Sequence, residues 1–540
     1  MFGKSTAYAG DAVWEKNGGI YLGKMVEPER NERDFPLEPS DDDAPFINGA
    51  GIKSSWPCTG GDIAFTGNRH LLTVGPNGSG KSRKLLLVNL FRLRDWSCAV
   101  VDPKGELCAL TALWRASRKN HKVVVVDPFG VMEKSYPRLF AKHGALLKSH
   151  GFNPLAGVDP ESLSFIDDVR KIATALVRTD NARDPYWAMA AQVLIKGVIM
   201  GLKAEYGPKA DLTLLRQVLG ATPAELAAYC QEQIKDFGTG VEALAASLNE
   251  FTKYSPDDRE LSGIRRTAQF HTEWLDSKLM KADLNWSKGD IKTAAMKKTP
   301  TTIYLVLPPK ELVEKATWLR MMITSLLMPL MDSVEPAPVP VLFMLDEAAA
   351  LGRLEIIENN YALLRQYGVK FWTVWQGLSQ AKLLYREWWE NLLANAGATQ
   401  AFAPQDLTTR DYLSKLGGER IKRRETYQRS ISKNKSSGYS DGKNYGSSGE
   451  GTGSGSNQKG WSAGGNKGTN WSEGKSESEN WGEQFANERR AKPHELAALE
   501  DDETVIFYRD GDLYLSVCPQ PEHIPGVAAE LRKAQQAIKG

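Results

Sequence analysis

The chain of 540 residues is poor in the residues that build disulfide frameworks and metal centres. It has five cysteines and seven histidines, and neither type clusters in the sequence. The scattered cysteines have no metal-ligand spacing and cannot all pair, which favours a reducing compartment. The cysteines are Cys58, Cys98, Cys108, Cys230 and Cys518.

The chain also lacks a strong net charge and a long apolar run. With 68 Lys and Arg against 66 Asp and Glu, the formal charge is +2, so contact with nucleic acid would have to come from local patches. The two most apolar stretches, 189–202 and 318–331, are short and are interrupted by Lys196 and Arg320. We therefore predict no membrane-spanning segment, and the first fifty residues contain no signal-peptide core.

The most informative segment that is present fits the pattern G-x-x-x-x-G-K-[ST] at every fixed position. An apolar stretch with strand character, 70–74, precedes it, and a stretch typical of a buried helix, 84–91, follows. In this context the glycines let successive N–H groups converge on an anion at the positive end of a helix. Lys81 is expected to reach the β- and γ-phosphates, and Ser82 to ligate Mg²⁺. The predicted nucleotide-binding residues of this loop are Gly75, Pro76, Asn77, Gly78, Ser79, Gly80, Lys81 and Ser82.

A second apolar strand, 339–345, ends in Asp346 and Glu347. Carboxylates at the end of a buried parallel strand lie where open α/β sheets bind ligands, so Asp346 is expected to hold Mg²⁺, directly or through water. Glu347 is the expected base or orienter for an attacking water, and the pair favours an ATPase over a non-hydrolysing switch. The cofactors that we predict are therefore ATP and Mg²⁺.

The next predicted strand, 368–375, ends at Gln376, and the residues between the two strands, 353–367, have helical periodicity. A strand–helix–strand unit places Gln376 beside Asp346 at one edge of the sheet. There the amide can sense the γ-phosphate or orient water.

Further strands at 97–102, 122–127 and 301–307 extend the α/β pattern, while 168–278 shows helical spacing and no clear strand. A β-hairpin is predicted around Asp510-Gly511. The predicted fold class is α/β, a P-loop nucleotide-binding domain with a mostly parallel sheet plus an inserted all-α domain. The expected divisions are 1–165, 281–428 and 485–540 for the nucleotide-binding domain, 166–280 for the all-α insertion and 429–484 for a low-complexity segment.

The low-complexity segment is dominated by Gly, Ser, Asn and Lys, so we expect it to be disordered. Trp461, Trp471 and Trp481 recur in it at intervals of ten. Three interpretations stay open, namely a loose tether, stacking on the bases of single-stranded DNA, and docking of a protein partner. The basic run at 420–429 either faces a phosphate backbone or is a solvated surface.

Several strings resemble, in order, the coupling proteins of type IV secretion systems, the TraG/TraD-type conjugative DNA transfer family. They are the P-loop, V-D-P-K-G-E-L at 101–107, F-N-P-L at 152–155, I-Y-L-V-L-P-P at 303–309, M-L-D-E-A at 344–348 with L-G at 351–352, and Q-G-L-S-Q at 376–380. The resemblance implies a RecA-like motor domain in a hexameric ring, with the all-α insertion on its cytoplasmic face. It also implies single-stranded DNA bound to a relaxase as cargo, and in some members proteins.

The partners that the resemblance implies are the channel ATPases and inner-membrane components of a type IV secretion system, at the cytoplasmic face of the bacterial inner membrane. Members of the family usually begin with transmembrane helices, and none precedes Ala9 here. Anchoring would then be peripheral, or through helices or a partner absent from this chain, and the isolated chain could be a monomer.

The resemblance also lends roles to charged residues. Arg365 stands where this family carries an arginine that completes the neighbouring subunit's site, and Arg69 is a second candidate for that role near the nucleotide. Asp102 and Lys104 are expected near the nucleotide as a structural or sensor pair. Two functions remain open, a DNA-translocating motor and a nucleotide-gated platform for protein substrates, and stimulation of hydrolysis by DNA separates them.

Overall fold

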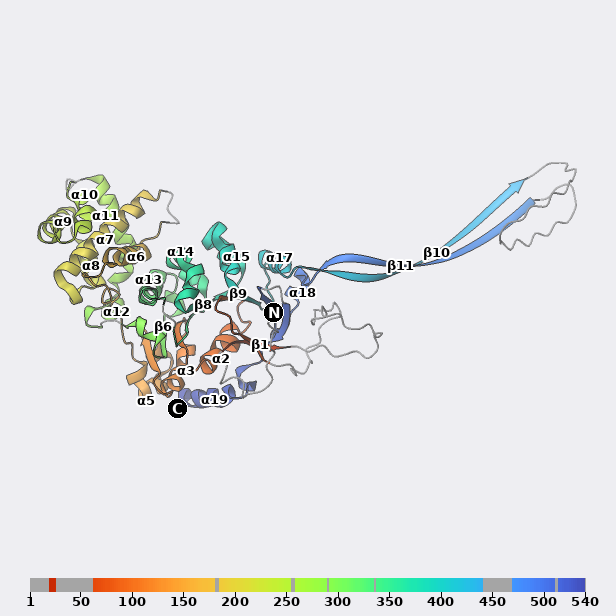
Figure 1. The fold of residues 1–540 in the computed structure, drawn as a ribbon, viewed down its shortest axis with the longest axis horizontal. Helices are drawn as coiled ribbons and strands as arrows, with labels where there is room; N and C mark the ends of the chain where they lie inside the picture. Colours follow the sequence, from red (N-terminus) through yellow and green to blue (C-terminus); the bar gives the residue numbers. More distant parts are fainter. Residues whose placement is uncertain are drawn as a thin grey trace. The chain divides into compact units, whose positions relative to one another are not determined.

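The computed structural model describes residues 19–25, 62–179, 184–253, 258–288, 291–334, 337–439, 469–509 and 513–539. These residues fall into two units, one within Met1–Gly418 and Arg490–Gly540 and the other within Glu419–Arg489. The larger unit contains a sheet, the helices on its two faces and a group of helices that follows β5 (Figure 1).

The larger unit is built on an 11-stranded sheet in the order β2-β1-β13-β12-β9-β3-β8-β7-β4-β6-β5. From β9 to β5 all neighbouring strands are parallel, and from β12 to β2 they are antiparallel. The strands are β1 Ile20–Met25, β2 Asp62–Phe65, β3 His70–Val74, β4 Ser97–Asp102, β5 Lys122–Val126, β6 Thr301–Val306, β7 Val341–Leu345, β8 Val369–Trp375, β9 Ala396–Ala401, β12 Glu503–Tyr508 and β13 Leu513–Val517.

The central strands are buried along their whole length because both faces of the sheet are covered. All residues of β3, β4, β6 and β7 are buried, as expected of parallel strands between two helical layers. In Figure 1, α2, α3, α5 and α19 lie on one side of the sheet, and α13, α14 and α15 on the other. The helices of these layers and their short neighbours are α2 Val88–Arg92, α3 Glu106–Ala116, α4 Val131–Ser135, α5 Pro137–Leu147, α13 Ala316–Leu327, α14 Glu355–Leu364, α15 Leu378–Tyr385, α16 Trp389–Ala394, α17 Leu407–Leu416, α18 Pro493–Ala497 and α19 Val527–Lys539.

Seven helices separate β5 from β6 after α4 and α5, and the described residues of this stretch contain no strand. Its hydrophobic core is continuous with one face of the sheet, because α6 packs on both α7 and α13. The predicted all-α insertion is therefore present. Its helices are α6 Phe165–Leu176, α7 Tyr186–Tyr206, α8 Leu212–Gly220, α9 Pro223–Phe237, α10 Glu242–Thr252, α11 Arg259–Thr272 and α12 Lys278–Asp283.

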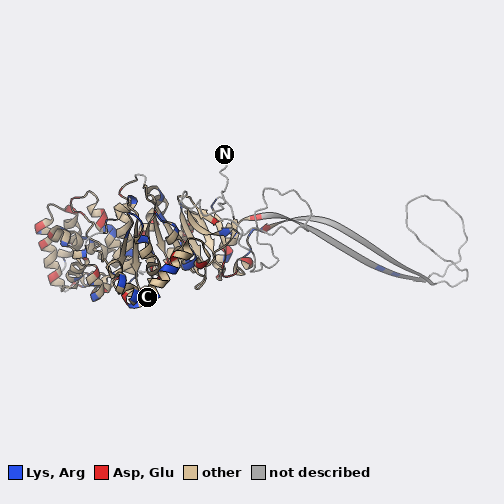
Figure 2. Cartoon of the chain, turned by 90° about the horizontal axis from the view of Figure 1, so that it is seen from below, with Lys and Arg blue, Asp and Glu red and all other residues tan. Residues whose placement is uncertain are grey.

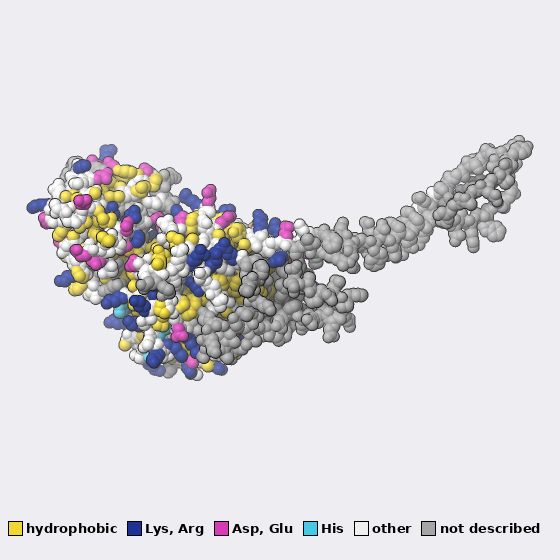
Figure 3. Space-filling model, in the orientation of Figure 1, with side chains coloured by type: hydrophobic (Ala, Val, Ile, Leu, Met, Phe, Trp, Pro, Cys, Tyr) yellow, Lys and Arg dark blue, Asp and Glu magenta, His cyan; other side chains and the backbone are white. Residues whose placement is uncertain are grey.

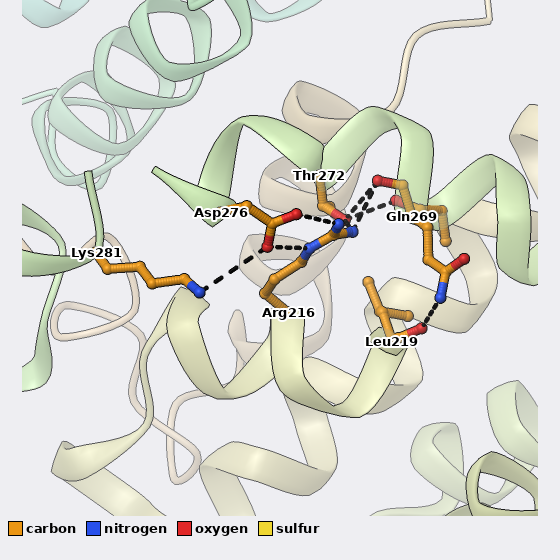
Figure 4. A network of polar contacts seen from close by, with 7 residues as sticks. Arg216, Leu219, Gln269, Thr272, Asp276 and Lys281 are labelled. Atoms are coloured by element: carbon orange, nitrogen blue, oxygen red, sulfur yellow. Dashed lines mark hydrogen bonds and ion pairs between the residues drawn. The ribbon is translucent and has the colours of Figure 1, made fainter. Parts of the chain in front are cut away.

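A polar network fastens the end of α11 to α8 (Figure 4). Arg216 donates from Nε to Asp276 Oδ1 at 2.9 Å and from Nη2 to Asp276 Oδ2 at 2.5 Å. Its third nitrogen, Nη1, donates to the carbonyl of Gln269 at 2.8 Å. The hydrogen bond from Arg216 lowers the pKa of the Asp276 carboxyl group. A two-pronged contact of this kind fixes the angle between two helices as well as their separation.

Helix α7 is the one described helix that is long and apolar enough, by length and composition, to cross a membrane. In the structure 61% of its most apolar window is buried, and α6, α10 and α11 pack against it. These contacts make α7 the central helix of the all-α insertion. Basic and acidic residues are both scattered over the helices of the larger unit (Figure 2).

The second unit is a two-stranded antiparallel ribbon of β10 Glu419–Tyr439 and β11 Thr469–Arg489. Its register pairs Glu419 with Arg489 and Tyr439 with Thr469 without a break. We expected disorder over 429–484, but both ends of that segment lie in the two strands of the ribbon. Backbone hydrogen bonds between the strands can form there without apolar side chains. Trp471 and Trp481 lie on β11, opposite Ser437 and Tyr427, whereas Trp461 lies outside the described residues.

Candidate nucleotide site

The predicted P-loop connects β3 to a helix that begins as a π-helical turn, Ser82–Leu87, and continues as α2. Gly78 and Gly80 have φ values of +84° and +83°, which side-chain-bearing residues rarely adopt. The backbone at the start of the loop is pinned, since Gly75 N–H donates to the Trp375 carbonyl at 3.1 Å. The loop therefore turns sharply at the carboxyl end of β3, as a phosphate cradle requires.

The Lys81 side chain folds back over this loop. Its Nζ donates to the carbonyls of Gly75 and Pro76 at 2.6 and 2.7 Å. Burial lowers the pKa of Lys81, and the charges of Asp346 and Glu347 act in the opposite direction. An ammonium group held in this way stands ready to exchange carbonyl partners for phosphate oxygens.

A second lysine clasps the loop from outside. Lys84 Nζ donates to the Ser79 carbonyl at 3.2 Å and pairs with Asp502 Oδ1 at 2.7 Å. It also donates to the Asp501 carbonyl at 2.7 Å, and its own side chain is only 4% exposed. The segment before β12 thus supports the P-loop, a contact between residues more than four hundred positions apart that the sequence did not reveal.

The two residues predicted to hold Mg²⁺ lie together. Asp346 follows β7, two strands from β3, and the Ser82 hydroxyl lies near enough to lower the pKa of its carboxyl group. Burial raises the pKa of Asp346, and the adjacent Glu347 raises it further, while Ser82 and Lys81 lower it. A half-buried carboxylate near a hydroxyl at the start of the P-loop helix is an oxygen donor set that fits a hard divalent cation.

Glu347 and Gln376 are also in contact, as the strand order predicts. Gln376 Nε2 donates to Glu347 Oε1 at 2.9 Å, and Gln376 N–H donates to Gln380 Oε1 at 3.0 Å. Glu347 has φ +73° and ψ +58°, a left-handed conformation that costs a side-chain-bearing residue about 1–2 kcal/mol. Strain of this kind is concentrated at functional sites, and here it aims a carboxylate that a neighbouring amide then holds in place.

Asp102 caps the helix that follows it, a structural role that was not predicted from the string V-D-P-K-G-E-L. Its carboxylate accepts from Cys108 N–H at 2.8 Å at the start of α3, and Gly105 has φ +67°. The same turn recurs after β5, where Asp127 accepts from Val131 and Met132 N–H groups. The string D-P-x-G therefore encodes a strand–turn–helix corner capped by its aspartate.

The capping aspartate is nonetheless close to the site. Burial raises the pKa of Asp102 to about 7, and the charge of Asp346 contributes. Lys104 lies near enough to Asp346 to lower the pKa of that carboxyl group. Both residues are thus placed beside the predicted Mg²⁺ ligands.

The two predicted arginines lie away from this chain's own phosphate cradle. Arg69 precedes β3, and six residues at about 3.3 Å each put it roughly 20 Å from Gly75. Arg365, in the 3₁₀ turn Arg365–Tyr367, precedes β8, which runs parallel to β3, so it lies toward the same far edge. Neither reaches the nucleotide site of its own subunit.

At the edge where the parallel strands begin, buried His70 connects β3 to its neighbours. His70 Nε2 donates to the Tyr361 carbonyl at 2.6 Å, and His70 Nδ1 accepts from Phe371 N–H at 3.0 Å. Burial lowers the pKa of His70 to about 4, and the charges of Arg365 and Lys370 lower it further. His70 therefore stays neutral and joins β3 to α14 and β8.

Comparison with known proteins places these features in a family. Residues 8–447, most of the chain, match the sequence profile described as type IV secretory system conjugative DNA transfer. The chain belongs to this conjugative DNA transfer family. The expectation drawn from the sequence strings is thereby confirmed.

Relatives and solved structures agree with the assignment to the conjugative DNA transfer family. The chain is 25% identical over 436 residues to the conjugal transfer protein TraG of Escherichia coli, which covers 76% of this chain and 64% of TraG. It is 25% identical over 363 residues to the protein VirD4 of Rhizobium radiobacter, covering 65% of this chain and 48% of VirD4. The chain thus spans less than two thirds of these relatives' lengths.

The fold of this family member matches solved coupling proteins. A structure of the bacterial conjugative coupling protein TrwBdeltaN70 aligns with a TM-score of 0.56 at 16% identity, over 83% of this chain and 84% of that one. TrwB in complex with ADP and Mg²⁺ aligns with a TM-score of 0.56 at 15% identity, over 85% and 88% of the two chains. The RecA-like P-loop fold with a helical domain, predicted from the sequence, is therefore confirmed.

Proposed function

We propose that this chain is the ATPase of a type IV secretion coupling protein, which hydrolyses ATP to deliver single-stranded DNA and its bound relaxase to the secretion channel. The observation that carries the proposal is the hydrogen bond from Gln376 to Glu347, at the sheet edge where Ser82 lies near Asp346. Ser82 and Asp346 would form a metal–phosphate site and the hydrogen bond positions a carboxylate for water, so together they favour hydrolysis over binding alone.

Each residue has a separate task in this proposal. The P-loop N–H groups and Lys81 bind the β- and γ-phosphates, and Ser82 with Asp346 would hold Mg²⁺, which would neutralise phosphate charge when bound. Glu347 accepts a proton from the attacking water or orients it, and Gln376 fixes the carboxylate through its amide. The TrwB complexes with ADP and Mg²⁺ and with a non-hydrolysable ATP analogue support this use of the fold.

The position of Arg365 supports the proposal of assembly into a ring. Because Arg365 is exposed and lies toward the edge opposite the phosphate cradle, it can act on a nucleotide only in a neighbouring subunit. We propose that Arg365 completes that neighbour's site in a homo-hexamer, with Arg69 as the second candidate. A guanidinium group there would neutralise charge that develops on the transferred phosphoryl group.

The partners and location proposed for the chain follow from the family. They are the ATPases and inner-membrane components of the secretion channel, with the ring at the cytoplasmic face of the inner membrane. The matching relatives include the type IV secretion system coupling protein VirD4 of Bartonella henselae, 23% identical over 391 residues, which supports this placement.

The deciding experiment is steady-state ATP hydrolysis measured with and without single-stranded DNA. Glu347→Gln should lower kcat by roughly 10²–10⁴-fold, the usual contribution of a general base. Glu314→Gln is the matched control, because that carboxylate is exposed and pairs only with Lys315 among the contacts described. Stimulation by DNA supports the motor, whereas hydrolysis indifferent to DNA favours the nucleotide-gated platform for protein substrates. Nucleotide binding without hydrolysis would indicate that the site forms only in the assembled ring.

A further inference from the structure

A basic pocket of about 490 Å³ lies between α6 of the all-α insertion and α13 and α14 of the nucleotide-binding domain. Five cationic side chains line it, and Glu355 is the one carboxylate in the described lining. In this part of the molecule, Lys and Arg side chains also gather on the surface over α14 and α15 (Figure 3). The five cations are Arg170, Lys171, Arg178, Arg320 and Arg353.

Some of this positive charge is balanced nearby. Arg170 pairs with Asp167, Lys171 with Asp168, and Arg353 with Glu358. Those carboxylates do not line the pocket, so a ligand inside it meets mainly the cations. An excess of guanidinium and ammonium groups around a concave volume favours an anion.

Two of the arginines converge at one point of the wall. A Cβ placed on Gly352 would lie 2.9 Å from Arg178 Nη1 and 3.4 Å from Arg320 Nη1. Arg320 is only 5% exposed, although it is a charged residue. A bound anion would give these two guanidinium groups a further, shared partner.

The other residues that line the pocket indicate which kind of anion it would bind. None of the lining residues that the structure describes is aromatic, so there is no platform on which bases could stack. Asn359, Asn360, Thr174 and Thr324 add neutral hydrogen-bonding groups to the arginine forks. Guanidinium forks with amide and hydroxyl groups suit the tetrahedral oxygens of a phosphate group.

The pocket is also one hydrogen bond from the catalytic turn. Arg320 Nη1 donates to the Leu351 carbonyl at 3.1 Å. Leu351 ends the 3₁₀ turn Ala348–Leu351, which begins directly after the strained Glu347. A change in the partners of Arg320 therefore acts on the turn that orients Glu347.

We propose that this pocket binds phosphate groups, from the backbone of single-stranded DNA or from a free phosphate compound, and that its occupancy is transmitted through Arg320 to Glu347. The proposal that the pocket binds phosphate rests only on the residues that line it. The transmission step rests on the ATPase function proposed above.

The test places a negative charge in the pocket without deleting any of its cations. Thr174 is half-buried on α6 and lines the pocket, so Thr174→Glu introduces a carboxylate, while Thr174→Gln has nearly the same size and no charge. Binding of a fluorescein-labelled oligothymidylate and of inorganic pyrophosphate is measured for both variants of the full chain. Because both variants keep the same P-loop, the difference between them reports the pocket.

The expected result is a dissociation constant at least roughly tenfold higher for Thr174→Glu than for Thr174→Gln, as a like charge at contact distance requires. Weakening for the oligonucleotide alone identifies DNA as the source of the phosphate, and weakening for pyrophosphate alone identifies a free compound. Lys171→Gln should reduce the salt dependence of oligonucleotide binding by a slope of roughly 0.7 if DNA occupies the pocket. Equal dissociation constants for both probes in the two Thr174 variants would overturn the proposal.

The transmission step has its own readout. Stimulation of ATP hydrolysis by the probe that binds should be lost in Thr174→Glu and kept in Thr174→Gln. If both variants hydrolyse ATP with the same stimulation, transmission through Arg320 is refuted. If neither hydrolyses ATP, the proposed ATPase function has failed, while the binding comparison still decides the pocket.

Discussion

The contact between Gln376 and Glu347 gives the sharpest prediction about turnover. Gln376→Leu removes the amide that donates to Glu347 Oε1 at 2.9 Å but keeps an apolar side chain of similar length. Gln376 makes no described contact with the P-loop side chains, so binding of the nucleotide should change little. The expected effect is therefore on kcat rather than on nucleotide affinity.

The magnitude follows from the charge on the acceptor. A hydrogen bond to a charged group contributes about 1.5–3 kcal/mol, and each 1.36 kcal/mol in the barrier is tenfold in rate. If Glu347 must be held in place for the reaction, kcat falls by roughly 10- to 150-fold. The left-handed backbone of Glu347 makes the loss larger within this range, because a strained carboxylate that loses its partner has another arrangement to relax into.

The assay is a double-mutant cycle on steady-state ATP hydrolysis, with Gln376→Leu, Glu347→Gln and the combination. Since the amide acts through the carboxylate, Gln376→Leu should add little once Glu347 is already Gln. Gln269→Leu is the control, because the amide of Gln269 contacts the Leu219 carbonyl within the all-α insertion, away from the nucleotide site. Additive effects of the two substitutions, or an unchanged kcat in Gln376→Leu, would refute the reasoning.

Three further predictions concern stability. Lys84→Met removes the ion pair with Asp502 and should lower the free energy of unfolding by about 1–2 kcal/mol, measured by thermal melts. It should also weaken nucleotide binding, measured by equilibrium titration. Unchanged nucleotide affinity would show that the contact between Lys84 and Asp502 does not support the P-loop. Because the pKa of Asp102 is raised from 3.8 to about 7, its contribution to the free energy of unfolding is fully present below about pH 4 and is lost as the pH rises through 7, by at most about 4 kcal/mol. Asp102→Asn should therefore make the melting temperature depend less on pH over this range. Parallel pH profiles of the melting temperature for the two proteins would contradict this prediction. Gly352→Ala, at φ +70° and ψ −160°, should cost about 1–3 kcal/mol in chemical denaturation. Gly220→Ala, whose Cβ meets nothing within 4 Å, should be neutral or stabilising.

The parallel core of the sheet was predictable because its strands are continuous apolar runs. The strands predicted at 97–102, 122–127 and 301–307 correspond to β4, β5 and β6, and the hairpin around Asp510-Gly511 to β12 and β13. Strand β9, Ala-Gly-Ala-Thr-Gln-Ala, was not predicted because it has no aromatic residue and Thr399 is its one β-branched residue. It is a strand because its small residues admit close neighbours, and a Cβ on Gly397 would lie 2.4 Å from Phe65 Cζ.

The candidate site was predictable where chemistry is encoded locally. The P-loop, Asp346, Glu347 and Gln376 each end or follow a recognisable strand, and parallel order alone brings them to one edge. The Lys84–Asp502 clasp and the pocket around Arg320 were not predictable, because they join segments that are distant in the sequence and carry no motif. The sequence also did not distinguish Asp102 as a helix cap from Asp102 as a sensor, since both need the same residue in the same place.

The pairing of β1 with β13 has a consequence for synthesis on the ribosome. The contact of Cys518 with the Leu22 carbonyl joins residues 496 positions apart, and the clasp on the P-loop also waits for Asp502. At roughly 5–20 residues per second, the ribosome needs about 25–100 s between making the two ends of this sheet. We therefore expect the antiparallel edge and the support of the P-loop to form late, so that a nascent chain acquires a fully supported nucleotide loop only after Asp502 and Cys518 have left the ribosome.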